Sequence, residues 1–181
     1  MSCINVINQI GGADGFVGTS LATAYPNLSI IIQDSAKLKP SADSKIPVEL
    51  KPRVFFAPHS FFDPQPVLSH QADVFLLRHI LHDWEDADCI TILRHILASM
   101  KPGARIIVAE QVLAPPHTGN AQTEKIMRAL DMQMLVQFCG KERTLDDWEA
   151  LFKRADPNLE IVGCVRPEGS ADTLLELKRQ A

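Results

Sequence analysis

The chain has 181 residues, of which 46% are hydrophobic and 22% are charged, which is enough to bury the core of one globular domain. Its formal net charge of -4 at pH 7 provides no basic surface for phosphate backbones, so nucleic acid is excluded as an expected partner. No apolar run approaches the ~20 residues that span a bilayer, no secretory leader is recognisable, and the four cysteines form no CxxC pair. These observations predict a single cytoplasmic domain over residues 1–181 with reduced thiols, no membrane partner and no metal site.

Runs of β-branched and apolar residues alternate with segments of helical spacing along the chain. Strands are predicted at residues 3–10, 28–34, 53–59, 72–81 and 104–113. Helices are predicted after Gly15 up to Pro26, at 85–100, 122–138 and 145–155, and the stretch 35–52 predicts loop with at most one short helix. Residues 159–167 and 172–179, joined by Glu168, Gly169 and Ser170, predict a closing hairpin. The alternation predicts an α/β fold, a mainly parallel sheet with helices on both faces and an antiparallel edge.

A glycine-rich turn, IGGADG, follows the first strand and opens the first helix. In that context Gly11, Gly12 and Gly15 allow the backbone to approach a nucleotide-like ligand, although a tight turn without a ligand uses glycine in the same way. Asp34 ends the second strand, where a carboxylate accepts hydrogen bonds from ribose hydroxyls or, alternatively, holds a turn. Together these residues predict an adenosine-containing cofactor, without separating a dinucleotide from S-adenosylmethionine.

A long central stretch carries a resemblance to a known family. Residues 72–113, ADVFLLRHILHDWEDADCITILRHILASMKPGARIIVAEQVL, resemble the catalytic core of the plant and fungal small-molecule (caffeate-type) O-methyltransferases that use S-adenosylmethionine, especially the fungal secondary-metabolite branch. The segments YPNLSIIIQD, FFDPQPV, GKERT and PEGSADTLLEL resemble that branch too, so the resemblance covers nearly the whole chain. It implies a Rossmann-like class I methyltransferase fold with a seven-stranded sheet whose last strand is antiparallel.

The same resemblance implies roles for individual residues. The histidine of the HDW motif, His82, corresponds to the general base, and Glu110 and Glu142 correspond to the two glutamates that flank it. A histidine with a pKa near 6.5 can take the proton of a phenol, whose pKa is about 10, as the new bond forms, without a metal. The implied reaction methylates a phenolic small molecule and leaves S-adenosylhomocysteine. Cofactor contacts are expected from the glycine turn and Asp34, and further from Ser60, Phe61 and Arg78.

Neighbouring residues receive structural interpretations. His79 is expected to be hydrogen-bonded or packed away from the site, Asp83 to cap the following helix and Trp84 to pack. The apolar side chains of the helix at 122–138 are expected either in the core or in the wall of an acceptor pocket; they are Met127, Met132, Met134 and Phe138.

The sequence departs from the family pattern at three cofactor positions and in extent. Gln9 stands where the family usually has an acid before the glycines, Ala13 at the third glycine position, and Ser60 where an acid is expected after strand three. The match starts at the first strand of the cofactor domain, whereas family members usually carry an additional N-terminal helical region that builds a homodimer and roofs the acceptor pocket. Two alternatives therefore accompany methyl transfer: a related enzyme that catalyses a rearrangement or pericyclic reaction, and an accessory protein that binds a partner through the exposed surface near residues 127–138.

Overall fold

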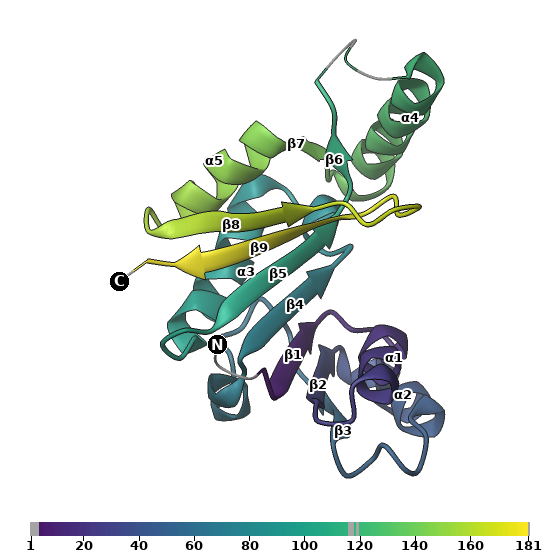
Figure 1. The fold of residues 1–181 in the computed structure, drawn as a ribbon, viewed down its shortest axis with the longest axis vertical. Coiled ribbons are helices and arrows are strands. Elements are labelled where there is room, and N and C mark those ends of the chain that lie inside the picture. Colours follow the sequence, from purple (N-terminus) through teal and green to yellow (C-terminus); the bar gives the residue numbers. More distant parts are fainter. Residues whose placement is uncertain (1–3, 116–117, 119, 181) are drawn as a thin grey trace.

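The computed structural model describes residues 4–115, 118 and 120–180, and its main feature is a seven-stranded sheet of order β3-β2-β1-β4-β5-β9-β8 (Figure 1). The strands are β1 (Val6–Ile10), β2 (Ser29–Asp34), β3 (Val54–Pro58), β4 (Val74–Arg78), β5 (Arg105–Glu110), β8 (Leu159–Val165) and β9 (Thr173–Arg179). Strands β1 to β5 pair in parallel, and β9 is antiparallel to both of its neighbours. The predicted fold class and closing hairpin are confirmed; the prediction that the first strand begins at Cys3 lies outside the described residues.

Helices cover the sheet on both sides (Figure 1). The first pair, α1 (Phe16–Ala24) and α2 (Lys39–Lys45), contacts β2 and β3, and the second pair, α3 (Asp86–Ser99) and α5 (Leu145–Ala155), packs together on the other face. Three short 3-10 helices are present, η1 (Ala36–Leu38), η2 (Val67–Gln71) and η3 (Leu81–Asp83). A separate two-stranded sheet, which the sequence pattern did not predict, pairs β6 (Val112–Leu113) with β7 (Arg143–Thr144). None of the described helices combines the length and apolar character needed to cross a membrane.

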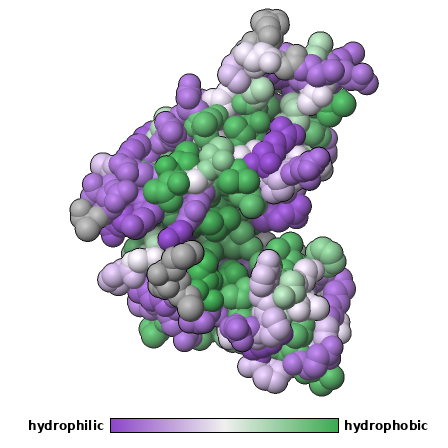
Figure 2. Space-filling model, viewed as in Figure 1, coloured by the Kyte–Doolittle hydropathy of each residue, from purple (hydrophilic) through white to green (hydrophobic). Residues whose placement is uncertain are grey.

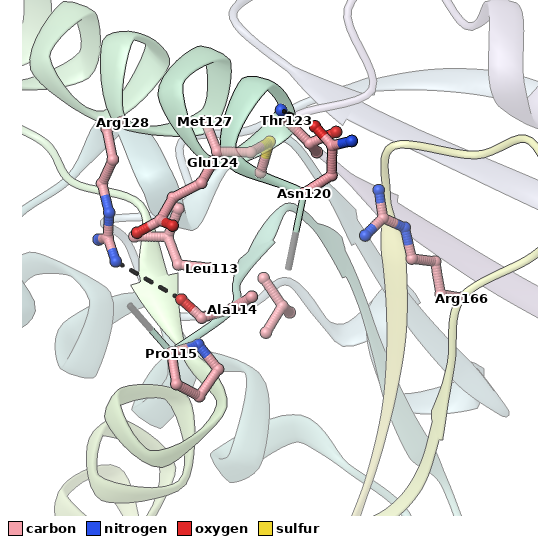
Figure 3. A pocket seen from close by; sticks show the side chains of 10 residues that line it. Leu113, Ala114, Pro115, Asn120, Thr123, Glu124, Met127, Arg128 and Arg166 are labelled. Atoms are coloured by element: carbon pink, nitrogen blue, oxygen red, sulfur yellow. Dashed lines mark hydrogen bonds between the residues drawn. The ribbon is translucent and has the colours of Figure 1, made fainter. Parts of the chain in front are cut away.

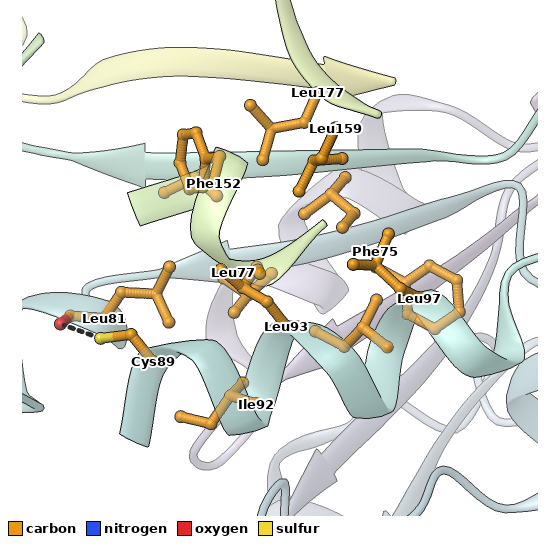
Figure 4. Close-up of a cluster of buried hydrophobic side chains, with 14 of the residues drawn as sticks. Phe75, Leu77, Leu81, Cys89, Ile92, Leu93, Leu97, Phe152, Leu159 and Leu177 are labelled. Atoms are coloured by element: carbon orange, nitrogen blue, oxygen red, sulfur yellow. Dashed lines mark hydrogen bonds between the residues drawn. The ribbon is translucent and has the colours of Figure 1, made fainter. Parts of the chain in front are cut away.

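Two clusters of buried side chains stabilise the two faces. Beneath α3 and α5, Phe75 and Leu77 of β4 belong to the larger cluster together with Leu93 and Phe152 (Figure 4). Beneath α1 and α2, Ile30 and Ile32 of β2 belong to the second cluster. Each fully buried side chain of this size contributes about 1.5–3 kcal/mol. On the α1 side, however, helices cover only β1 to β3, and a groove of about 690 Å³ remains along β4, β5 and β9.

The end of β4 differs from the prediction. The strand ends at Arg78, because His79 adopts a left-handed conformation with φ of 52° and turns the chain into η3. His82 therefore lies in a 3-10 turn and not in a strand, and the residue that precedes α3 as its N-cap is Glu85. The prediction that Asp83 caps this helix is wrong, since the turn places Asp83 three residues before the first residue of α3.

Helix α4 (Ala121–Phe138) begins after Asn120, whose side chain accepts hydrogen bonds from the N–H groups of Gln122 and Thr123. It projects away from the sheet (Figure 1), and none of its described residues is buried. Met132 and Phe138 are 59% and 51% exposed. The core interpretation of these apolar residues is thus wrong, because helical periodicity predicts an apolar face without saying what covers it. Their place in an acceptor wall stays a prediction.

Candidate active site

The predicted site residues converge at the carboxyl ends of the parallel strands, where α/β sheets bind their ligands. Gly11 and Gly15 have φ of 63° and 85°, in the left-handed region that favours glycine. A Cβ at Gly12 would lie 2.7 Å from Ile32 Cγ2, and one at Gly15 would lie 2.5 Å from Ile32 Cδ1. The protein's own packing therefore requires these glycines, whether or not a ligand binds the turn.

Asp34 holds the glycine turn against the end of β2. Its Oδ2 accepts the N–H of Ala13 at 2.8 Å, and its Oδ1 accepts the N–H of Ser35 at 2.6 Å. A carboxylate offers about four acceptor positions, so two remain, and the side chain is only partly buried. Asp34 thus holds the turn, which is one of its two predicted roles. Its remaining acceptor positions fit the hydroxyls of a ribose.

Gln9 has a structural role that the sequence did not reveal. Its Oε1 accepts the N–H of Gly18 at 3.0 Å, inside the first turn of α1, where the N-cap residue Gly15 supplies no side-chain bond. A Cβ at Gly18 would lie 2.8 Å from this same oxygen. A neutral amide in place of the family's acid thus satisfies an otherwise free helical N–H group.

The segment after β3 lies beside the glycine turn. The N–H of His59 donates to the carbonyl oxygen of Asp34 at 3.0 Å, which brings Ser60 and Phe61 to the same edge of the sheet. The Phe61 ring lies near Gly11 and is edge-on to Trp84, at 5.8 Å between centroids. Phe61 thus offers an apolar surface next to the turn, and Trp84 packs as predicted.

Arg78 is the predicted cofactor residue that the structure does not bring to the glycine turn. Its guanidinium forms an ion pair with Asp172, with 3.2 Å between Arg78 Nη2 and Asp172 Oδ2, and its side chain lines the groove along β4, β5 and β9. Its assignment as a cofactor contact gains no support from these contacts.

His82 lies between acidic side chains, and its own side chain is 12% exposed. Its Nδ1 is 3.0 Å from Glu142 Oε1 and 3.7 Å from Glu110 Oε2, so the hydrogen bond is to Glu142 and the interaction with Glu110 is electrostatic. Its Nε2 is 3.4 Å from Asp83 Oδ1. Both glutamate side chains are almost completely buried. The predicted arrangement of His82 beside Glu110 and Glu142 is therefore present.

The electrostatics of this cluster favour a charged imidazole. Burial alone would lower the pKa of His82, but the hydrogen bond to Glu142 and the charges of Glu110, Glu142 and Asp83 outweigh burial and raise that pKa above 6.5. Burial raises the pKa of Glu110 and is also the main cause of the raised pKa of Asp83. Because a carboxylate only accepts, Glu142 selects the tautomer with hydrogen on Nδ1, which leaves the lone pair on Nε2. His82 can therefore take up a proton at Nε2.

Glu110 also positions the turn that carries His82. Its Oε1 accepts the N–H groups of Ile80 and Leu81, both at 2.9 Å. Nearby, His79 Nε2 is 2.7 Å from Asp172 Oδ1, so His79 is held by the β8-β9 connection, as its structural interpretation requires.

Three supporting residues were missed by the sequence analysis. Arg143 is fully buried, pairs with Asp86 at 2.9 Å and donates to the carbonyl oxygens of Leu81 and Trp84. Asp131 of α4 accepts the N–H of Glu142 at 2.9 Å, and Asp172 holds His79. Arg143 and Asp172 had a sequence indication, because they belong to the GKERT and PEGSADTLLEL segments, whereas Asp131 had none.

A close backbone approach at Gly140 leads to a testable prediction. A Cβ there would overlap the carbonyl oxygen of His82 and lie 2.8 Å from the carbonyl carbon of Asp83. We expect Gly140→Ala to lower the free energy of unfolding by about 1–3 kcal/mol, through overpacking. We also expect the pKa of His82 to fall towards 6.5, because its pairing with Glu142 is disturbed. Urea unfolding and an NMR titration of the His82 ring would measure both.

The matched control is Gly169→Ala, because a Cβ at Gly169 meets nothing within 4 Å. Its positive φ of 76° makes this variant lose stability through backbone strain alone. An unchanged His82 pKa in Gly140→Ala, or the same change in both variants, would contradict the assigned role of Gly140.

A small pocket lies beside α4 (Figure 3), and His82 is not among the residues that line it. Leu113, Asn120, Met127 and Arg166 contribute to its wall, and its volume is about 60 Å³. Small-molecule sites usually enclose about 300–1,000 Å³, so this pocket is too small for an aromatic metabolite. No three His, Cys, Asp or Glu side chains in the described part of the chain are placed to hold a metal ion.

Comparison with curated proteins finds fungal enzymes over nearly the whole chain. O-methyltransferase aoiO of Aspergillus oryzae is 62% identical over 97% of this chain, which covers 44% of that protein. O-methyltransferase fsr2 of Gibberella fujikuroi is 40% identical over 93% of this chain and is also covered to 44%. The chain thus spans less than half the length of these relatives.

Solved structures match the same fold. The mitomycin 7-O-methyltransferase MmcR superposes with a TM-score of 0.85 and 26% identity, covering 98% of this chain and 49% of that chain. Human N-acetylserotonin methyltransferase, in complex with S-adenosylmethionine, gives 0.83 and 25%, covering 98% and 48%. A structure described as a pericyclic reaction enzyme gives 0.83 and 27%, covering 98% and 43%.

A sequence profile of the O-methyltransferase domain matches residues 1–156, which include the glycine turn, Asp34 and all three members of the His82 cluster. That match spans well over half of the chain, and the fungal relatives agree with it over nearly all of the rest. The chain belongs to the O-methyltransferase domain family.

Proposed function

We propose that this chain is the catalytic domain of an enzyme that transfers a methyl group from S-adenosylmethionine to a hydroxyl group of an aromatic small molecule, with His82 as the general base. The observation that carries the proposal is the enclosed His82–Glu142 pair, 3.0 Å apart, at the sheet edge that also presents Asp34. The acceptor class is inferred from the family and from its fungal secondary-metabolite members.

The cofactor-binding residues are proposed to be Asp34, the turn at Gly11, Gly12 and Gly15, and the segment at Ser60 and Phe61. Asp34 retains acceptor positions for a pair of hydroxyls, and Phe61 provides an apolar surface beside the turn. S-adenosylmethionine, when bound, supplies a methyl group on a positively charged sulfur, which an oxygen nucleophile can displace in line.

His82 performs the proton transfer in this proposal. Its Nε2 takes the proton of the acceptor hydroxyl while the oxygen–methyl bond forms, and Glu142 and Glu110 stabilise the resulting imidazolium. General-base assistance is worth about 10²–10⁴ in rate, whereas orientation of two reactants supplies about 7–11 kcal/mol. Positioning of the two substrates therefore contributes more than the base.

Calorimetric titration with S-adenosylmethionine and S-adenosylhomocysteine tests the cofactor assignment. We expect the chain to bind both ligands and Asp34→Ala to bind at least ten times more weakly, because a hydrogen bond to a charged group is worth about 1.5–3 kcal/mol. The matched control is Asp43→Ala on α2, whose carboxylate pairs with Lys39 at the surface. Absence of binding at millimolar ligand, or equal weakening by both substitutions, would contradict the assignment.

A second candidate is a reaction without methyl transfer, and the match to the pericyclic reaction enzyme favours it. Transfer of isotopically labelled methyl from the cofactor to a panel of phenols separates the two. Cofactor binding without labelled product would support the second candidate, and labelled product would support methyl transfer. An accessory role, favoured by the exposed Ile126, Leu135 and Val136 of α4, predicts no cofactor binding at all.

A further inference from the structure

A cluster of polar side chains is buried on the sheet face that packs against α3. Its members are Asn8 of β1, Gln33 of β2, Gln65 of the segment after β3 and Ser69 of η2. The parallel-strand partners of Asn8 and Gln33 are Phe75 and Ile10, which belong to the hydrophobic cluster beneath α3. Because side chains alternate between the faces of a strand, the two amides point away from α1 and into this interior.

The two faces of the sheet distribute polar and apolar side chains in an unexpected way. Figure 2 shows hydrophobic side chains gathered along the middle of the face that carries α1, over the strands labelled β4, β5 and β9 in Figure 1. Asn8, Gln33 and Ser69, in contrast, are at most 1% exposed. A buried polar group is unfavourable unless it is hydrogen-bonded, and apolar side chains of the same size avoid that penalty. Stability alone therefore does not explain the polar cluster.

The Ser69 hydroxyl makes every hydrogen bond that a hydroxyl group can make. Its oxygen accepts hydrogen bonds from Asn8 Nδ2 and from Gln33 Nε2, both at 2.9 Å. Its proton is donated to Gln65 Oε1 at 3.0 Å. A hydroxyl has one donor and two acceptor positions, and these three amides use all of them. Ser69 thus joins β1, β2 and the segment after β3, which are distant in the sequence.

The three amides depend on Ser69 for their hydrogen bonding. The second polar atom of each amide is buried without a partner among the described residues; these atoms are Asn8 Oδ1, Gln33 Oε1 and Gln65 Nε2. Loss of the Ser69 hydroxyl would therefore leave all three side chains unpaired. Such a network fixes one arrangement of its segments only while its central hydroxyl is present.

Two of the joined strands lead directly into the proposed cofactor site. Gln33 precedes Asp34 in the chain, and the Gln33 carbonyl oxygen accepts the N–H of Gly12 at 2.9 Å. Asn8 lies on β1, which ends just before Gly11. The side chains that bond Ser69 thus belong to the strands that carry Asp34 and the glycine turn.

The third joined segment, residues 60–66, carries Ser60 and Phe61. Near its start, the Phe62 ring packs edge-on to Trp84, with 4.7 Å between centroids. Towards its end, Gln65 is held by Ser69, whereas residues 63 and 64 between these two contacts are exposed. The Gln65–Ser69 bond therefore fixes the end of the segment on the sheet.

We propose that Ser69 is a positioning residue, whose hydroxyl fixes the 60–66 segment on β1 and β2 and thereby places Ser60 and Phe61 at the cofactor site. Ser69 acts through the segment, because its own side chain is fully buried. The link to the cofactor rests on the proposed function, whereas the link between Ser69 and the segment does not.

Hydrogen exchange of Ser69→Ala, followed by NMR or mass spectrometry, tests the link to the segment without a ligand. The N–H of Asp63, which donates to the carbonyl oxygen of Ser60 at 2.9 Å, reports on the segment. Amides of residues 60–66 should exchange about ten times faster than in the wild type, and amides of α5 should be unchanged. The matched control is Ser99→Ala, because the Ser99 hydroxyl is also buried but bonds only the carbonyl oxygen of Ile96 in its own helix, α3.

Calorimetry with S-adenosylhomocysteine tests the link to the cofactor. Ser69→Ala should bind this ligand about fivefold more weakly, the factor that corresponds to one hydrogen bond of ordinary net strength, and Ser99→Ala should bind it like the wild type. A variant in which Asn8→Leu, Gln33→Met, Gln65→Met and Ser69→Ala are combined separates positioning from stability. Its apolar cluster should regain thermal stability relative to Ser69→Ala, while binding stays weak and exchange of residues 60–66 stays fast.

The outcomes distinguish this inference from the proposed function. Exchange that is faster throughout the protein, unchanged exchange in residues 60–66, or the same effects in Ser99→Ala would overturn the role of Ser69. Binding that recovers together with thermal stability in the combined variant would also overturn it, since Ser69 would then be merely structural. If the wild type binds no S-adenosylhomocysteine, the cofactor assignment fails, and the hydrogen exchange alone decides whether Ser69 positions the segment.

Discussion

His82→Ala is expected to lower the turnover number for methyl transfer by about two to four orders of magnitude, with little change in the affinity for S-adenosylmethionine. The base acts on the acceptor hydroxyl in the transition state and does not hold the adenosine. Glu142 and Glu110 retain their backbone contacts when the imidazole is removed, so the site should keep its shape. Steady-state assays with labelled cofactor and calorimetry measure the two quantities separately.

The pH profile supplies a second readout for His82. Because its pKa is raised above 6.5, the imidazole is protonated at low pH and becomes an effective base only as pH rises through that pKa. Turnover should rise over this range in the wild type, and His82→Ala should lose the rise. The stabilisation that the imidazolium gains from its carboxylates is complete below pH 6.5 and is lost as pH rises through the folded pKa.

The matched control is His79→Ala. His79 pairs with Asp172, and its ring centroid lies 5.4 Å from that of His82. His79 is therefore a neighbouring histidine whose hydrogen bond is to Asp172 and not to Glu142. It should reduce stability more than turnover. Equal loss of turnover in both variants, or a rise with pH that persists in His82→Ala, would contradict the assignment of the base.

Arg143→Met is expected to lower the free energy of unfolding by about 1–3 kcal/mol for each buried carbonyl group that loses its donor, as measured by urea denaturation. The substitution leaves Asp86 without its buried partner and removes the donors to the carbonyl oxygens of Leu81 and Trp84. These two residues lie on either side of His82, so turnover should also fall. Asp86 keeps its ion pairs with Lys141 and Arg154, so the loss of stability follows mainly from the two carbonyl groups that lose the Arg143 donors.

The control for Arg143 is Arg154→Met, which removes an exposed guanidinium that pairs with the same carboxylate at 2.8 Å. An exposed pair contributes about 0–1 kcal/mol, so this variant should remain close to the wild type. Similar losses in the two variants would show that burial of Arg143 is not the cause.

The dependence of the free energy of unfolding on acid pH compares the wild type with Arg143→Met through the ionisation of Asp86. Burial would raise its pKa, but hydrogen bonds from Arg143 and Lys141 outweigh burial and lower it to about 2. Its contribution is complete above its ordinary pKa near 3.8 and is lost as pH falls towards 2. Arg143→Met should weaken this acid dependence.

The local patterns of the sequence determined the order of the elements and the class of the fold. Alternating β-branched runs and helical spacing predicted the five parallel strands and the closing hairpin, because side-chain periodicity is a property of neighbouring residues. The HDW motif, the end of the fifth strand and the KERT segment, by their resemblance to a family, identified His82, Glu110 and Glu142 as a cluster although 28 and 60 positions separate the glutamates from the histidine.

Contacts between distant segments could only be decided by the tertiary structure. Asp172 holds His79 from 93 residues away, and the left-handed turn at His79, which removes His82 from the strand, is stabilised by such contacts. Helix α4 has an apolar face in the sequence, yet only the fold shows that none of its described residues is buried. The same holds for the groove over β4 and β5: the runs VFLL and IIVA predict burial on two sides, whereas which side lacks a helix depends on where α1, α3 and α5 pack. Periodicity encodes that a face is apolar, and the three-dimensional arrangement of the other elements decides what that face contacts.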